Sequence, residues 1–74
     1  MVRNKKAVTL LLGDADMEML EDLAKKKDAS KTAVIKQALR LYRTVDSRIE
    51  SGEELIFRKR MPEGQDQLEV FYLI

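Results

Sequence analysis

The sequence contains no cysteine and no histidine. Without cysteine, neither a disulfide nor a thiolate metal site can stabilise the fold, and the absence fits a reducing compartment. Without histidine, the chain lacks the commonest general base and metal ligand. A chain of 74 residues also buries only a small core by itself. We therefore expect no cofactor, and we expect dimerisation to supply the missing buried area.

Glycines are too few and too scattered for a nucleotide-binding loop. The chain has three, Gly13, Gly52 and Gly64, at widely separated positions. The acids within residues 14–18 fall where a helix is expected to begin, so capping and solubility explain them better than metal or acid–base chemistry. The sequence therefore argues against an enzyme.

Long apolar runs are also absent. The longest, near Leu10 and Val70, are far shorter than the ~20 residues of a membrane helix. The start of the sequence lacks the apolar stretch of a signal peptide. We therefore expect a cytoplasmic protein without a membrane partner.

Charge is distributed unevenly, although the net charge is only +1. Residues 1–43 carry ten basic and six acidic side chains, a net +4, whereas residues 44–74 carry four and seven, a net −3. Arg3, Lys5 and Lys6 have no acid close by in the sequence. These residues form either a solvated terminus or an arm that binds an anionic partner.

Residues 5–12 alternate in the manner of a half-buried strand. Val8, Leu10 and Leu12 share the more apolar face. The opposite face carries Lys5, Ala7, Thr9 and Leu11. One strand cannot form a sheet, so we expect it to pair with the same strand of a second chain in an intertwined homodimer. A two-stranded ribbon of this kind fits the major groove of DNA.

Two helices are predicted after this strand. The first begins near residues 13–16, has an apolar stripe that includes Leu20 and Leu23, and ends in lysines that suit the helix dipole. Ser30 is the predicted N-cap of the second helix, and Gly52 is its predicted stop. The apolar residues of the second helix recur at helical spacing: Ile35, Ala38, Leu39, Tyr42, Val45 and Ile49.

The end of the chain is predicted to be a β-hairpin. Residues 55–60 and 68–74 are strand-like, and Pro62 with Gly64 suits the turn between them. An isolated hairpin is marginal in water, so its apolar face is expected to pack on the helices. We divide the chain into a DNA-binding and dimerisation domain at residues 1–51 and a hairpin extension at residues 52–74.

This arrangement resembles the ribbon-helix-helix family, the MetJ-, Arc- and CopG-like DNA-binding proteins, over about residues 3–45. The segment that begins at Ser30, followed by Ala38 and Leu39, is the more specific part. The residues that carry the resemblance are Lys5–Leu12, Leu20–Ala24, Ser30–Ile35, Ala38, Leu39 and Tyr42. It implies an α+β fold: a β-α-α homodimer, here with an added C-terminal hairpin.

The resemblance also implies roles for individual residues. The outward strand residues would contact bases, and the basic arm and the start of the second helix would contact phosphates. Base contacts would come from Lys5, Ala7 and Thr9, and phosphate contacts from Arg3, Lys6, Ser30, Lys31 and Thr32. The shared dimer core would consist of Val8, Leu10, Leu12, Leu20, Leu23, Ile35, Ala38, Leu39 and Tyr42.

Two features depart from the family pattern, one in the strand and one in the turn. The outward strand positions are usually polar or basic, whereas Ala7 and Leu11 are apolar. A glycine often stands in the turn before the second helix, where this chain has Asp28. Aspartate accepts left-handed backbone moderately well, so the turn is expected to survive this change.

The sequence thus predicts a sequence-specific binder of double-stranded DNA and a transcriptional repressor. The alternative is a protein-interaction or antitoxin-like module whose hairpin binds a partner protein, with weak or no DNA binding. Arg58, Lys59 and Arg60 either guard a strand edge or contact flanking phosphates or an acidic partner. The final strand offers an edge that another protein could extend.

Overall fold

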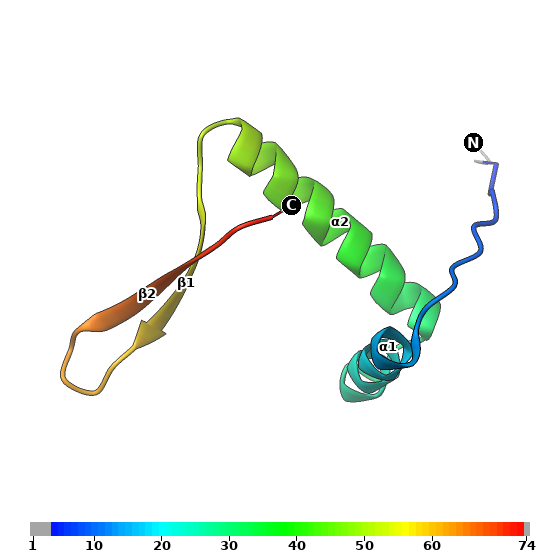
Figure 1. Ribbon diagram of the computed structural model, residues 1–74, viewed down its shortest axis with the longest axis horizontal. Helices are drawn as coiled ribbons and strands as arrows, with labels where there is room; N and C mark the ends of the chain where they lie inside the picture. Colours follow the sequence, from blue (N-terminus) through cyan, green and yellow to red (C-terminus); the bar gives the residue numbers. More distant parts are fainter. Residues whose placement is uncertain (1–3, 74) are drawn as a thin grey trace. The chain divides into compact units, whose positions relative to one another are not determined.

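The computed structural model describes residues 4–73 (Figure 1). It contains two helices, α1 (Asp14–Lys26) and α2 (Lys31–Glu50), followed by two strands, β1 (Leu55–Arg60) and β2 (Asp66–Phe71). The strands pair antiparallel in one two-stranded sheet. The expected α+β class and the C-terminal hairpin are therefore confirmed. The chain divides into two compact units between Ile35 and Lys36, and each is described by itself.

The expected strand at residues 5–12 is not present in this single chain. Residues 4–13 have no regular secondary structure, so the order is helices and then hairpin rather than β-α-α. A strand is defined by the hydrogen bonds it exchanges with a neighbour. In the described part of the chain no strand pairs with this segment, because the one sheet contains only β1 and β2.

The turn between the helices follows from two residues. Asp28 adopts a left-handed φ of 51° and ends α1, as the sequence predicted. Its N–H donates to the carbonyl of Lys25 at 3.2 Å, and the Ala29 N–H donates to the carbonyl of Ala24 at 2.9 Å, which completes a Schellman motif. Ser30 is confirmed as the N-cap of α2, because its Oγ accepts the Ala33 N–H at 3.0 Å.

Helix α2 ends in the same way at Gly52. Its φ is +95°, a backbone angle that residues other than glycine rarely adopt. The Gly52 N–H donates to the carbonyl of Ile49 at 3.0 Å, and the Glu53 N–H donates to the carbonyl of Arg48 at 3.0 Å. The predicted stop at Gly52 is therefore confirmed, and it directs the chain into β1.

The hairpin forms within one chain. Its register joins Leu55 to Phe71 and Arg60 to Asp66, so β2 begins two residues earlier than the sequence predicted. The turn is short enough for this because the Gly64 N–H donates to the carbonyl of Met61 at 3.0 Å, with Gly64 at a φ of +83°. Pro62 and Gly64 therefore set the turn as predicted.

Burial is low throughout the described residues. Ala24, at 8% exposure, is the only hydrophobic residue among them that is buried. Nine further apolar side chains are half-buried: Leu12, Met17, Leu20, Val34, Val45, Ile49, Leu55, Val70 and Leu73. Apolar residues make up 45% of the chain, so most of its apolar surface still faces solvent.

Candidate nucleic-acid interface

The predicted base-contacting residues lie on the segment before α1. Lys5, Ala7 and Thr9 are all exposed. Their neighbours Val8 and Leu11 are also exposed, at 82% and 96%. This segment therefore presents both its polar and its apolar side chains to solvent in the single chain.

The predicted phosphate-contacting residues fall into two groups. In the first, Lys6 is exposed, and Arg3 lies outside the described residues. In the second, Ser30, Lys31 and Thr32 are exposed around the start of α2. The structure thus brings the second group together in one turn of backbone.

The start of α2 has the chemistry of an anion-binding site. Helix geometry leaves the N–H groups of the first turn without intrahelical acceptors, and the positive end of the helix dipole lies there. The side chain of Ser30 satisfies one of them, that of Ala33. The N–H groups of Lys31 and Thr32 remain available to a phosphate oxygen.

Lys31 has a neighbour that the sequence did not predict. Its Nζ lies 3.9 Å from Oε1 of Glu21 on α1, and both side chains are more than half exposed. Such a pair is worth only about 0–1 kcal/mol and is screened by salt. A phosphate can therefore compete with Glu21 for the ammonium group. Ten residues separate the two along the chain, so only the turn at Asp28 brings them together.

The predicted dimer core is largely uncovered. Two of its nine residues, Leu12 and Leu20, are half-buried. The other seven are exposed: Val8, Leu10, Leu23, Ile35, Ala38, Leu39 and Tyr42. Leu39, for example, is 71% exposed. The prediction concerned a core shared between two chains, so it remains a prediction. Met19 and Leu41 are exposed apolar residues that were not predicted to belong to this core.

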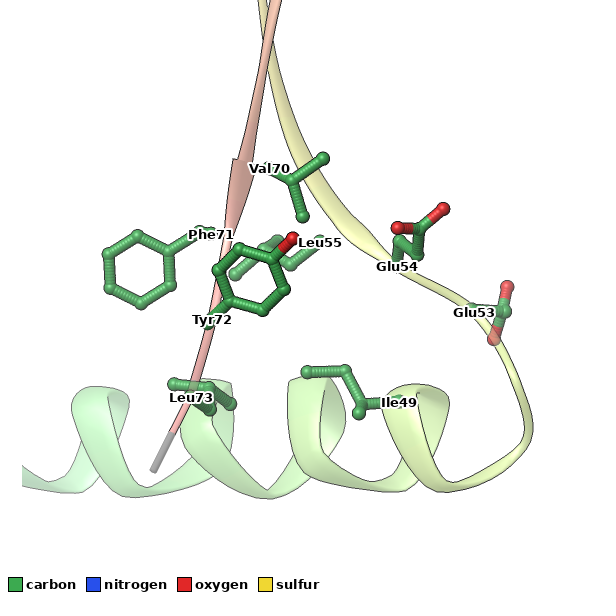
Figure 2. Close-up of a pocket in the computed structure, with 8 residues that line it drawn as sticks. All are labelled: Ile49, Glu53, Glu54, Leu55, Val70, Phe71, Tyr72 and Leu73. Carbon is green, nitrogen blue, oxygen red and sulfur yellow. The ribbon is translucent and has the colours of Figure 1, made fainter.

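A separate apolar hollow lies where α2 leads into the hairpin (Figure 2). Ile49, Leu55, Val70 and Leu73 line it and are half-buried. Within residues 4–73, the expected packing of the hairpin's apolar face on the helices is not seen beyond this point. Glu53 and Glu54 stand on the segment that enters β1. These two acids were not assigned to any site from the sequence. Away from this hollow, Phe57 and Leu68 remain exposed.

Two further features of the described part of the chain concern metal clusters and membrane-spanning helices. Residues 4–73 contain no cluster of three or more potential metal ligands among His, Cys, Asp and Glu. In the same residues, neither helix combines the length and apolar character that crossing a bilayer requires.

Comparisons with models of protein families, with curated proteins and with solved structures find no match. Function is therefore inferred from the residues themselves and from their geometry.

Proposed function

We propose that two copies of this chain form a ribbon-helix-helix dimer that binds double-stranded DNA sequence-specifically and acts as a transcriptional repressor. The observation that carries the proposal is the exposure of Val8, Leu10, Ile35 and Leu39 in the single chain. Fully burying a side chain of this kind contributes roughly 1.5–3 kcal/mol. Ala24 is the only buried hydrophobic residue in the described part of the chain, so burial against a second copy would add considerable stability.

The segment before α1 supports a second copy as the partner. Val8 and Leu10 alternate with Ala7 and Thr9, so a strand would place the first pair on one face and the second on the other. An antiparallel pair of such strands satisfies the backbone groups that the single chain leaves unpaired. The apolar face then covers the helices, and the polar face is turned outward.

The outward face suits the major groove. It presents Lys5 and Thr9 twice, where a lysine can donate to guanine acceptors and a threonine can donate or accept. The start of α2, with Ser30 and Lys31, would hold the flanking phosphates. Base contacts thus provide specificity, and phosphate contacts fix the register.

The test is fluorescence anisotropy with the duplex upstream of the protein's own gene and a scrambled duplex, over a salt series. We expect tighter binding to the native duplex and a steep negative slope of log affinity against log salt. Contacts to ~6–10 phosphates would be evident as a change in affinity between 50 mM and 200 mM salt. If both duplexes bind equally and weakly over that range, the proposal is wrong for the duplex upstream of the gene.

A second candidate is a protein-interaction module centred on the hairpin. It is favoured by the exposure of Phe57, Leu68 and Tyr72, the last at 82%. Apolar side chains on a strand pair are a common docking surface. Capture of one defined protein by the wild type, lost with Leu68→Glu but not with Thr9→Ala, would support this candidate over DNA binding.

A further inference from the structure

The outer edge of β1 has no strand beside it. Within residues 4–73, β1 pairs with β2 alone, so its second row of backbone N–H and C=O groups is unpaired. An edge of this kind is a template for another strand. The first five residues of β1 (Leu55–Arg60) and the two residues before it have a symmetrical sequence from Glu53 to Lys59: two acids, three apolar residues and two bases.

We propose that β1 pairs antiparallel with β1 of a second copy, around a two-fold axis at Ile56. The two hairpins then form one four-stranded sheet with the order β2-β1-β1-β2. This contact is separate from the proposed DNA-binding ribbon and does not depend on it. Since the same surface is used by both copies, the assembly closes upon itself.

The register follows from the sequence of the segment. With Ile56 opposite its own copy, Leu55 lies opposite Phe57 of the second copy. Glu54 lies opposite Arg58 of the second copy, and Glu53 lies opposite Lys59 of the second copy. Every position therefore meets a complementary one, and each charge pair occurs twice. Opposite charges and apolar pairs directly across from each other stabilise a sheet.

Other registers are less complementary. Directly opposed residues of an antiparallel pair point to the same face of the sheet. The two-fold axis must therefore pass through a residue and not between two residues, so the alternatives are axes at neighbouring residues. An axis at Phe57 places Leu55 opposite Lys59 and Ile56 opposite Arg58. An axis at Arg58 opposes two arginines. Only the axis at Ile56 matches acids with bases and apolar residues with apolar residues.

The edge of β2 cannot pair with β2 of a second copy in a complementary way. Its charged residues, Asp66 and Glu69, are both acidic, so no self-pairing of β2 brings opposite charges together. An axis at Glu69 opposes two glutamates. Pairing β1 of one copy with β2 of another would repeat without closing and produce fibres. The geometry therefore favours β1 with β1.

The charges of the segment are accessible for this contact. Glu54 and Lys59 form no ion pair with another described residue. Glu53 lies 3.5 Å from Arg48, and Arg58 lies 3.7 Å from Asp66, with all four side chains at least 40% exposed. Pairs this exposed exchange partners readily. Phe57, at 59% exposure, and Ile56, at 44%, supply the apolar centre.

The absence of cysteine allows a direct test. In Ile56→Cys, two copies of residue 56 would lie directly opposite, with Cα atoms ~4.5–5.5 Å apart, which is inside the ~4.4–6.8 Å that a disulfide spans. We expect rapid formation of a disulfide-linked dimer under mild oxidation. Leu68→Cys is the matched control, an exposed aliphatic position on β2. Its two copies would be three strand spacings apart across the sheet and four residues apart along it, about 20 Å in all, and should cross-link slowly.

Charge reversal in the Ile56→Cys background tests the register. Glu54→Arg alone and Arg58→Glu alone each oppose two pairs of like charges, and each should slow cross-linking about tenfold or more. In an equimolar mixture of the two variants, the mixed dimer restores every pair, so the rate should recover to within about twofold of the parent, since half of the encounters are mixed. A defect within one hairpin could not be rescued by mixing. Glu63→Arg, the same change in the turn, should have no effect.

The two results decide the matter together. If Ile56→Cys cross-links no faster than Leu68→Cys, or if mixing fails to restore the rate that both charge variants lose, the β1 contact is wrong. Because the readout reports position 56 only, failure here leaves the DNA-binding proposal untouched, and failure of DNA binding leaves this contact untouched.

Discussion

Asp28 and Gly52 perform the same task with different side chains. Both stand just beyond a helix in left-handed conformation, with φ values of 51° and +95°, and both donate an N–H to the last turn of that helix. For residues with a Cβ this conformation costs roughly 1–2 kcal/mol, and aspartate tolerates it better than most. The two positions thus allow the backbone cost to be measured inside one protein.

We expect Asp28→Gly to raise the free energy of unfolding by about 0.5 kcal/mol, because glycine adopts the left-handed region without steric cost. Gly52→Ala should lower it by about 1 kcal/mol. No atom lies within 4 Å of a Cβ built at Gly52, so the loss would be purely conformational. Urea denaturation measures both. A destabilised Asp28→Gly would mean that the aspartate side chain makes a contact worth more than the strain.

Lys31 is expected to matter for DNA affinity and not for stability. Lys31→Ala loses only the exposed pair with Glu21, so the free energy of unfolding should change by less than about 0.5 kcal/mol. Binding to every duplex should weaken, with a salt slope flatter by about 1 per lost phosphate contact.

Thr9→Ala should instead relax the preference for the native duplex, by about 1–3 kcal/mol per base contact. Lys36→Ala is the control for a helix lysine outside the proposed interface. Wild-type binding by both Lys31→Ala and Thr9→Ala would show that the assigned face is wrong.

Elements differed in how far the sequence alone could predict them. The helices and the hairpin turn were predicted because their signals are local: Ser30 caps, Gly52 stops and Gly64 turns. The start of β2 was predicted two residues late, because Asp66 is a poor strand former and only its cross-strand register with Arg60 brings it in. The contact between Lys31 and Glu21 was missed because it spans two elements.

The segment at residues 5–12 is the element that decides the architecture. Its pattern predicts a strand, yet the single chain has none, since pairing is a property of two segments and not of one. In the proposed ribbon, Leu10 lies on the apolar face that covers the helices, and Leu11 lies on the outward face. They are chemically identical neighbours, which makes them a matched pair for substitution.

Leu10→Glu should abolish dimerisation and, with it, DNA binding, because the charge would enter the apolar core of the proposed dimer. Leu11→Glu should leave the dimer intact and impair only DNA binding, because its side chain would lie on the outward, DNA-facing side of the ribbon. Sedimentation equilibrium measures the first property and anisotropy the second. Equal effects of the two substitutions on mass would exclude an ordered ribbon.

At the scale of the whole molecule, folding and association should be one event. Ala24 is the only buried hydrophobic residue that the described chain contains, and domains of this size are marginal even with a full core. In the proposed dimer, the second copy would cover the apolar side chains that are exposed in the single chain. Stability is then inseparable from concentration.

We expect the midpoint of thermal unfolding to rise with protein concentration. A hundredfold increase should add about 2.7 kcal/mol to the stability of a dimer with no folded monomer. Circular dichroism at 222 nm, a wavelength that reports helix, follows this directly for α1 and α2. A midpoint independent of concentration would mean that the single chain folds by itself.

The thin core around Ala24 has a consequence for the protein in a cell. If the proposed repressor folds only as a dimer, it would be exposed to proteases whenever it is scarce, because degradation follows the population of the open form. Its lifetime would then increase with its own abundance. Newly made chains would disappear quickly at low copy number and persist at high copy number, so repression would switch on over a narrow range of synthesis rates without any effector.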